Sequence, residues 1–282
     1  MKILIVGGNS NVGISLKGAL SPSNKIVTLG RKGNDLELDL NNLVGKFDLP
    51  PDFDVIIHTA AGFGVRSDED ILSTESVNVL GTLKLCQAAV QARTKHFIFI
   101  SSIYTTVSNQ SGHYNFYSLS KKHAEDVASL YCSLHKLPLT ILRLSPLYGN
   151  MEGFKIHQPF FYLLIEKASR GEDIILFGKN DPLRNYLHID DLVEIIKRII
   201  VQKVFGTYSC TNINDVTYSQ IAQAAFTAFN KTGRVYFDKD KPDIPDSIFE
   251  KDFSLYDSIN YFPVISIHEG MLRMAKSKKS NI

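Results

Sequence analysis

The chain has no tryptophan, little cysteine, almost no charge imbalance and no long apolar run. Its 31 basic residues exceed its 29 acidic ones by two, so we expect no broad basic surface and no nucleic-acid partner. The apolar run that begins at Ile3 stops at Gly7, far short of the ~18 residues of a membrane span, and it does not resemble a signal peptide. We therefore expect no membrane partner.

Cys86, Cys132 and Cys210 are too far apart for a metal-binding or redox motif. We expect them to be buried free thiols of a cytoplasmic protein, and we expect no metal site. The 44% hydrophobic and 21% charged residues are typical of a globular protein and exclude collagen-like, coiled-coil and disordered classes.

The 282 residues suffice for about two domains. Short β-branched runs alternate with segments of helical period, which predicts an α/β fold of the Rossmann type with a doubly wound parallel sheet. The expected strands of this sheet are 2–6, 25–29, 55–58, 96–100 and 139–144, with helices at 12–20, 76–91 and 116–135. Residues 1–150 are thus predicted to be a dinucleotide-binding domain.

Residues 151–282 are predicted to form a smaller α/β domain that binds substrate, with elements around 183–212 returning to the first domain. Expected here are helices at 158–170, 190–202 and 219–229, a strand at 174–177 and a loop at 238–247. Asp190 is the predicted N-cap of the second of these helices.

The first predicted strand leads through Gly7 to Gly13 and a helix, which is the setting of a dinucleotide-binding turn. Gly7 permits the tight turn, and Gly13 allows the helix to pack closely. The helix N-terminus, at Ser10, Asn11 and Val12, would offer N–H groups to a pyrophosphate. Ser10 replaces the usual middle glycine, so its side chain either crowds the phosphate or donates a hydrogen bond to it.

Arg31 and Lys32 follow the second predicted strand, where NAD-binding enzymes usually carry an acidic residue. Arg31 suits bidentate binding of a 2′-phosphate, and the alternative is an ordinary solvated loop. We therefore expect NADP(H) to be preferred, with NAD(H) as the alternative.

Tyr117 and Lys121 are four residues apart, which places them on one face of a helix. Ser101 and Ser102 end the preceding strand, so these groups can meet at the carboxyl edge of the sheet, where open α/β folds bind ligands.

The chain resembles the extended short-chain dehydrogenase/reductases, the epimerase/dehydratase family that acts mostly on nucleotide-activated sugars. Besides the glycine turn and Tyr-x-x-x-Lys, the similar segments are Asp39-Leu40, 54–61, 78–82, 143–149 and 184–191.

The resemblance implies that Tyr117 is the general acid, that Lys121 holds the nicotinamide ribose, and that Ser102, rather than Ser101, donates to the developing alkoxide. It also implies cofactor contacts from Asp39, Leu40, Ala60, Ala61, Asn78, Tyr117 and Lys121. Asn78 is interpreted as a brace of the site and His58 as a packed core histidine.

For the substrate, the resemblance implies contacts from Ser102, Tyr104, Ser145 and Arg184, with Lys155, His157 and Gln158 as further candidates. Ser145 stands where many relatives have Asn. Arg184 is expected to bind the pyrophosphate of a nucleotide-activated sugar or, alternatively, to pair with Asp190 or Asp191.

Sugar 4,6-dehydratases of the family carry Thr-Asp-Glu where this chain has Ser102-Ile103-Tyr104, so dehydration is not expected. Reduction of the 4-keto group of a nucleotide-activated deoxysugar by NADPH fits best. The alternatives are a 4-epimerase with tightly bound NAD(P) and a non-catalytic NADP sensor. Family habit implies a homodimer formed through helices 76–91 and 116–135.

The substitution Arg31→Asp is expected to shift the preference in kcat/KM from NADPH toward NADH, because a carboxylate repels a 2′-phosphate. Steady-state kinetics with both cofactors measures the ratio, and Lys25→Asp, at the start of the same predicted strand, is the control. An unchanged ratio in Arg31→Asp would refute the NADP prediction.

Overall fold

The computed structural model describes residues 1–42, 47–108 and 113–280, which divide into two units. The first unit comprises Met1–Leu144, Val193–Cys210 and Asp252–Tyr261, and the second comprises Ser145–Leu192, Thr211–Lys251 and the rest of the chain. Within the described residues no helix is both long and apolar enough to cross a membrane.

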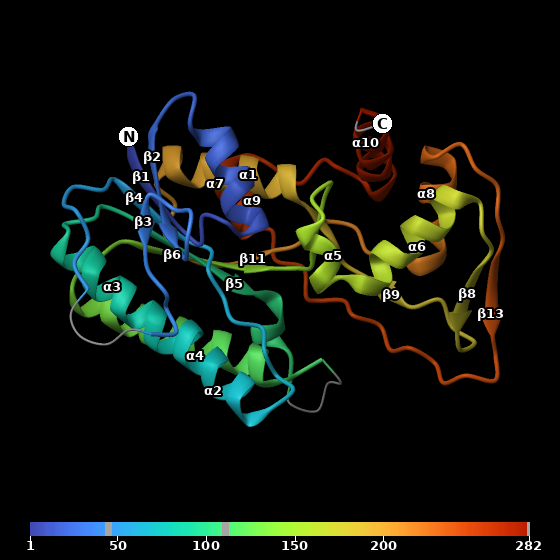
Figure 1. The fold of residues 1–282 in the computed structure, drawn as a ribbon, viewed down its shortest axis with the longest axis horizontal. Coiled ribbons are helices and arrows are strands. Elements are labelled where there is room, and N and C mark those ends of the chain that lie inside the picture. The colour runs from blue at the N-terminus through green and yellow to red at the C-terminus, as the bar shows by residue number, and fades with distance from the viewer. Residues whose placement is uncertain (43–46, 109–112, 281–282) are drawn as a thin grey trace. The chain divides into compact units, whose positions relative to one another are not determined.

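A seven-stranded parallel sheet forms the first unit, in the order β11-β6-β5-β4-β1-β2-β3 (Figure 1). The strands are β1 Lys2–Val6, β2 Lys25–Gly30, β3 Leu36–Glu37, β4 Val55–His58, β5 Phe97–Ser102, β6 Leu139–Leu144 and β11 Gly206–Cys210. The predicted Rossmann-type sheet is therefore confirmed. Its strand order reverses between β1 and β4, and open α/β sheets bind ligands at the carboxyl edge of such a reversal.

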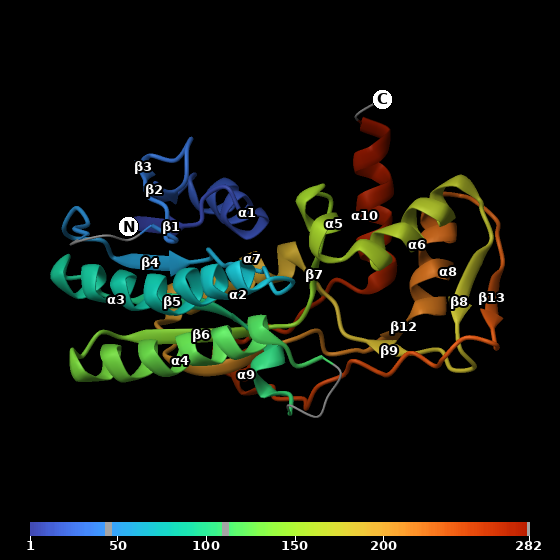
Figure 2. The ribbon, with the colours of Figure 1, turned by 60° about the horizontal axis from the view of Figure 1, so that its bottom comes forward.

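The core lies between this sheet and its helices. All six residues of β5 are buried, as expected for a parallel strand covered on both faces. Helices α3 Gly81–Gln91 and α4 Phe116–Leu134 lie side by side (Figures 1 and 2), where small side chains such as Ala89, Ala124 and Ala128 are buried. The three cysteines are also buried and free.

The predicted helix 76–91 needs correction. The structure has α2 Asp68–Glu75, a π-helical turn Ser76–Leu80 and then α3. Sequence reasoning missed α2 because its acidic first turn, capped by Ser67, shows no apolar period. The wider π turn inserts an extra residue into the helical repeat, a feature common at functional sites, and it carries Asn78.

Helix α7 Ile189–Gln202 corrects a second expectation. Asp190 lies inside its first turn instead of capping it, and the Asp190 N–H donates to Nδ1 of His188 at 3.2 Å. The His188 side chain, which precedes the helix, thus accepts the hydrogen bond that a capping side chain would otherwise accept from a backbone N–H of the first turn.

The second unit has its own short sheets and helices (Figure 2). Its paired strands are β7 Leu147–Tyr148 with β10 Leu187–His188, β9 Leu183–Arg184 with β12 Val216–Thr217, and β8 Ile174–Phe177 with β13 Val235–Asp238. Its helices are α5 Gly153–His157, α6 Pro159–Arg170, α8 Tyr218–Ala228 and α10 Ile267–Ser280, whereas α1 Asn11–Leu20 and α9 Ser254–Ile259 belong to the first unit.

A buried carboxylate joins α4 to the centre of the sheet. Glu125 accepts hydrogen bonds from Ser101 Oγ at 2.5 Å and Thr105 Oγ1 at 3.2 Å. The Arg143 guanidinium of β6 forms a bidentate pair with it, with Nη2 at 2.6 Å from Oε2. Removal of one partner from such a buried group leaves unsatisfied charge or acceptors.

We expect Ser101→Ala to lower the free energy of unfolding by about 1–3 kcal/mol, because it removes a hydrogen bond to a buried carboxylate. Urea unfolding followed by circular dichroism measures the change. Ser133→Ala, at an exposed position of α4, should stay within about 0.5 kcal/mol of the wild type. An unfolding midpoint unchanged in Ser101→Ala would contradict the stabilising role of the hydrogen bond between Ser101 and Glu125.

Candidate active site

Gly7 in the turn after β1 and Gly13 in the first turn of α1 both lie where a Cβ would clash with backbone. Gly7 has a φ of +86°, and a Cβ there would lie 2.7 Å from the backbone nitrogen of Ala60. A Cβ on Gly13 would lie 2.3 Å from the Gly7 carbonyl oxygen. The turn therefore places α1 in close contact with the ends of β1 and β4. These residues thus fit a dinucleotide bound at the N-terminus of α1.

Ser10 is the N-cap of α1. Its Oγ accepts a hydrogen bond from the Gly13 N–H at 2.9 Å and lies 2.9 Å from Oγ1 of Thr59. Thr59 donates to the Val6 carbonyl at 2.9 Å, so the Ser10 hydroxyl proton is directed to Thr59. The hydroxyl is thus used as a cap in this structure, while the N–H groups of Asn11 and Val12 in the first turn have no partner within the helix.

Arg31 directly follows β2 and is exposed. In the part of the chain that the structure describes it forms no ion pair. Nearby acidic groups already accept hydrogen bonds: the Asp35 carboxylate accepts from N and Oγ1 of Thr28, both at 2.8 Å, and these bonds lower the pKa of Asp35. Glu37 accepts from the Gly33 N–H at 3.0 Å.

Asp39 and Leu40 differ in exposure. The Asp39 side chain is exposed and accepts from the Asn41 N–H at 3.0 Å, whereas Leu40 is buried in the core and lies next to Gly81. Their contact with adenine stays a prediction.

Asn78 holds the loop that follows β4. Its Oδ1 accepts from the Gly62 N–H at 2.8 Å, and its Nδ2 donates to the Gly62 carbonyl at 3.0 Å and to Ser120 Oγ at 2.9 Å. The amide of Asn78 thus ties this loop, which contains the half-buried Ala60 and Ala61, to α4. This is the geometry of a brace.

Ser102 and Tyr117 meet at the carboxyl end of β5. Ser102 is its last residue, and Tyr117 is the second residue of α4. Burial raises the pKa of Tyr117, a hydrogen bond with Ser102 opposes this, and Tyr104 raises the pKa further. Ser101, by contrast, donates to Glu125, so only the second serine faces the tyrosine.

Lys121 is buried, with 2% of its surface exposed. Its Nζ donates to the Ile100 carbonyl at 2.7 Å and lies 4.5 Å from the ring centroid of Phe99. Burial lowers the pKa of Lys121 to about 7, and Glu125, one helical turn further along α4, opposes that shift. The Lys121 ammonium therefore loses its proton near neutral pH.

His58 is fully buried and lies close enough to Lys121 to feel its charge. Its ring stacks on Phe99 at 5.3 Å, and its Nε2 lies 3.0 Å from Thr82 Oγ1. Because Thr82 donates its own proton to the Asn78 carbonyl at 2.6 Å, Nε2 is the donor. Burial, with the Lys121 charge, lowers the pKa of His58, which makes it a neutral core histidine as predicted.

Sequence reasoning missed Phe63. Its ring stacks on that of Tyr117, with the centroids 4.8 Å apart and the planes 19° apart. Only proximity in the fold reveals this contact, because 54 positions separate the two residues in the sequence. A lone phenylalanine between two glycines gave no periodic signal.

Ser145 and Arg184 belong to the second unit. Arg184 is mostly buried, and its Nε donates to the Tyr218 hydroxyl and its Nη1 to the Pro245 carbonyl, both at 2.8 Å. Ser145 is buried, and its Oγ has no hydrogen-bond partner among the described residues.

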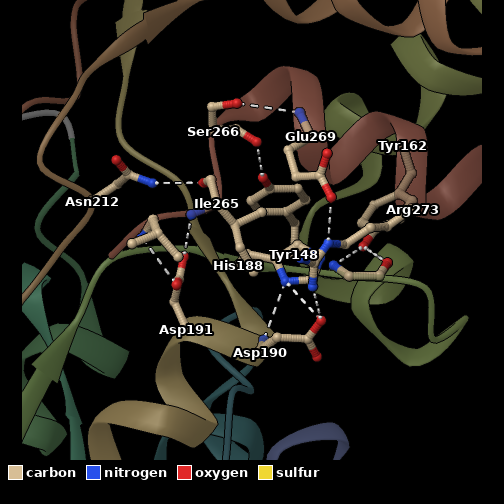
Figure 3. A network of polar contacts seen from close by, with 12 residues as sticks. Tyr148, Tyr162, His188, Asp190, Asp191, Asn212, Ile265, Ser266, Glu269 and Arg273 are labelled. Carbon is tan, nitrogen blue, oxygen red and sulfur yellow. Dashed lines mark hydrogen bonds and ion pairs between the residues drawn. The ribbon is translucent and has the colours of Figure 1, made fainter. Parts of the chain in front are cut away.

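The carboxylates predicted as alternative partners of Arg184 have other contacts (Figure 3). Asp190 pairs with Nη1 of Arg273 at 2.8 Å, and Asp191 accepts from the backbone N–H groups of Val264 and Ile265. Both carboxylates therefore fasten the segment that leads into α10.

The other second-unit candidates lie around α5. Lys155 pairs with Glu166, and burial lowers the pKa of His157, while Gln158 joins α5 to α6. Within the described ranges no group of three or more His, Cys, Asp or Glu residues could hold a metal ion.

The chain has relatives among known proteins. Residues 3–211 match the model of the NAD dependent epimerase/dehydratase family. A putative UDP-glucose 4-epimerase of Methanocaldococcus jannaschii is 24% identical over 282 residues, covering 94% of this chain and 87% of the relative.

Among the solved structures that share the fold are one complexed with NADPH and one complexed with NAD. The structure of RMD from Pseudomonas aeruginosa complexed with NADPH has a TM-score of 0.79 at 18% identity and covers 100% of this chain and 99% of that one. UDP-glucose 4-epimerase of Thermus thermophilus in complex with NAD has a TM-score of 0.75 at 19% identity, with 100% of both chains covered. Because the family model matches well over half of the length of this chain, the chain belongs to the NAD dependent epimerase/dehydratase family.

Proposed function

We propose that the chain reduces the 4-keto group of a nucleotide-activated deoxysugar with NADPH. The observation that carries the proposal is the meeting of Ser102 and Tyr117 at the end of β5, with Lys121 one turn along the same helix. This set can bind and protonate a carbonyl oxygen.

The bound cofactor would supply the hydride to the carbonyl carbon. Tyr117 then gives its proton to the carbonyl oxygen, so that its O–H bond breaks as the new O–H bond forms. Since burial raises the pKa of Tyr117, the phenol holds that proton at neutral pH. Ser102 donates a hydrogen bond to the same oxygen as negative charge develops on it.

Lys121 stabilises the phenolate that forms when Tyr117 gives up its proton. An ammonium one helical turn away favours the negative form by its charge. Because burial lowers the pKa of Lys121 to about 7, the ammonium is charged below that pH and loses its charge above it. A charged cofactor ring would also favour the phenolate.

The exposed Arg31 supports NADPH as the preferred cofactor. It follows β2 without an ion-pair partner among the described residues, and the nearby Asp35 and Glu37 already accept hydrogen bonds from Thr28 and Gly33. A 2′-phosphate would thus meet a free guanidinium. One protein of the same fold is complexed with NADPH.

Dehydration is disfavoured by the residues after Ser102. Ile103 is aliphatic and buried, with 1% of its surface exposed, and Tyr104 is not a carboxylic acid. Elimination of water needs an acid and a base at these positions, and neither residue supplies a carboxylate.

A 4-epimerase is the second candidate, because the relative in Methanocaldococcus jannaschii is named a putative UDP-glucose 4-epimerase. An epimerase needs the same Ser, Tyr and Lys but regenerates its cofactor in each turnover. The two candidates therefore differ in whether NADPH is consumed, and a non-catalytic NADP sensor would bind NADPH without turnover.

Ser145 and Arg184 are also proposed to contact the substrate. The Ser145 hydroxyl is buried without a partner among the described residues, so it has hydrogen-bonding capacity for a ligand. Arg184 is the proposed partner of the pyrophosphate, with its orientation set by Tyr218.

We also propose that the chain is a homodimer formed through the helices of 76–91 and 116–135. Leu130 and Leu134, one turn apart on α4, have 65% and 70% of their surface exposed. Such a pair of exposed leucines favours contact with another apolar surface. The three buried free thiols support the cytoplasm as its compartment.

The first expected outcome concerns catalysis. Wild-type protein should oxidise NADPH, followed at 340 nm, with a 4-keto-6-deoxyhexose linked to UDP, dTDP, CDP or GDP and generated in place by a dehydratase. Tyr117→Phe should lower kcat about 10²–10⁴-fold, because it removes the general acid.

The control is Tyr131→Phe, which removes a hydroxyl from a distant turn of α4. Interconversion of 4-epimers without NADPH consumption would establish the epimerase instead. NADPH binding without turnover on any donor would favour the sensor.

The second expected outcome concerns assembly. Wild type should elute with a mass about twice 31.6 kDa in size-exclusion chromatography with light scattering. The double substitution Leu130→Glu/Leu134→Glu should yield the monomer, because it charges the apolar contact. Val201→Glu, at a position with 74% of its surface exposed on α7, is the control. A wild-type mass of 31.6 kDa would refute the dimer.

A further inference from the structure

A row of side chains along α4 contacts consecutive residues at the end of β5. The members of this row are four residues apart and lie on one face of the helix: Tyr117, Lys121 and Glu125. Nζ of Lys121 donates to the Ile100 carbonyl at 2.7 Å. Glu125 accepts from Oγ of Ser101 at 2.5 Å, and Ser102, the next residue of the strand, is the partner of Tyr117. The row therefore places a carboxylate one helical turn from Lys121.

Both charged members of the row are removed from water. Lys121 has 2% of its surface exposed and Glu125 has 3%. The Ile100 carbonyl and the Phe99 ring, which contact the ammonium, carry no net charge. A buried charge is costly unless an opposite charge offsets the loss of water. The Glu125 carboxylate supplies this opposite charge, and it opposes the fall in the pKa of Lys121 that burial causes.

The other titratable groups around Lys121 carry no negative charge at neutral pH. On β4, burial lowers the pKa of His58, so its ring is neutral. On α4, burial raises the pKa of Tyr117, and Tyr104 in the turn after β5 raises it further, so the Tyr117 phenol keeps its proton. Within the described residues, Glu125 is thus the only group that offers Lys121 a negative charge.

Two further acids near α4 lie on its solvent side. Asp126 is exposed, and Glu75 of α2 pairs with the exposed His123 at 3.4 Å. Water and salt screen charges in such positions. Their effect on the buried Lys121 ammonium is therefore weak compared with that of Glu125.

Glu125 is held in place independently of Lys121. Its Oε1 accepts from Ser101 and Thr105. The Arg143 guanidinium of β6 donates to both carboxylate oxygens, with Nη2 2.6 Å from Oε2. The Arg143 side chain keeps 32% of its surface exposed, so solvent screens its charge more than that of the buried carboxylate. Arg143 therefore fixes the carboxylate without cancelling its negative charge at Lys121.

Resting on the function proposed above, we propose that Glu125, fixed by Arg143, is a positioning residue that keeps Lys121 charged and directed at β5. Glu125 acts through Lys121, whose ammonium favours the phenolate of Tyr117. Without the Glu125 charge the pKa of Lys121 is lower, so the ammonium loses its proton at a lower pH. The upper end of the pH range in which Tyr117 gives up its proton readily therefore depends on Glu125.

The test uses Glu125→Gln, which removes the charge and keeps the size of the side chain. In full-length protein labelled with ¹³C-lysine, the Cε signal of Lys121 reports the ionisation of Nζ, and Lys121→Met assigns it. This signal should titrate at least about one pH unit lower in Glu125→Gln than in wild type. The fall of kcat/KM for NADPH oxidation at high pH, which reports the free enzyme, should move to lower pH with it.

Asp126→Asn is the matched control, because it removes the same charge from the neighbouring, exposed position of α4. Its Lys121 signal should titrate as in wild type, and thermal melting reports the folding of each variant. If Glu125→Gln does not fold, the double substitution Glu125→Gln/Arg143→Gln leaves no unpaired charge. Lys121 should still titrate below wild type in it, because the screened Arg143 charge acts less on the ammonium than the buried carboxylate.

The outcomes separate the two proposals. A Lys121 titration identical to that of wild type in the folded Glu125 variant would overturn the role of Glu125 and leave the reductase standing. An equal shift in Asp126→Asn would also overturn it, because any lost acid would then act alike. The expected shift in a protein that oxidises NADPH with none of the sugars would overturn the proposed function and leave the action of Glu125 on Lys121. Parallel shifts of the titration and of kcat/KM support both.

Discussion

The buried Glu125 carboxylate is the interaction on which the geometry of the site depends. It joins α4 to Ser101 on β5 and to Arg143 on β6, and α4 carries both Tyr117 and Lys121. The cost of burying this charge is offset only while its partners remain in place. The same carboxylate also opposes the loss of charge on Lys121. A single buried group thus connects the stability of the sheet to the proposed chemistry.

The start of α1 shows a second constraint, which is steric. With Gly7 and Gly13 in close contact with neighbouring backbone, the helix begins close to the ends of β1 and β4. Ser10 then serves as a cap whose hydroxyl is satisfied by Gly13 and Thr59. The two roles considered for Ser10 from the sequence concerned a phosphate, and the contact with Thr59 was invisible there because Thr59 follows a different strand.

Local patterns predicted most of the sheet. The five expected strands are present because continuous β-branched and aliphatic runs suit a buried parallel strand, and the helices around Ala89 and Ala124 follow from their apolar period. The patterns failed where polar or irregular segments form structure: α2 has an acidic start, the π turn disrupts the helical repeat, and Asp190 has a capping residue's chemistry but lies within its helix. The glycine turn and the Tyr117–Lys121 spacing could be recognised in the sequence because each involves only residues close together along the chain.

The sequence by itself determined the fold class and the family, since strand period, glycine positions and four-residue spacing are properties of neighbouring residues. The resemblance already favoured Ser102 over Ser101, and the tertiary structure supplies the physical reason, because Ser101 is directed to Glu125 by the packing of α4 on β5. Only the tertiary structure decided that Asn78 holds the loop after β4 and that Phe63 stacks on Tyr117. The physical reason is that hydrogen bonds and ring contacts between distant segments depend on how the elements pack, which no local pattern encodes.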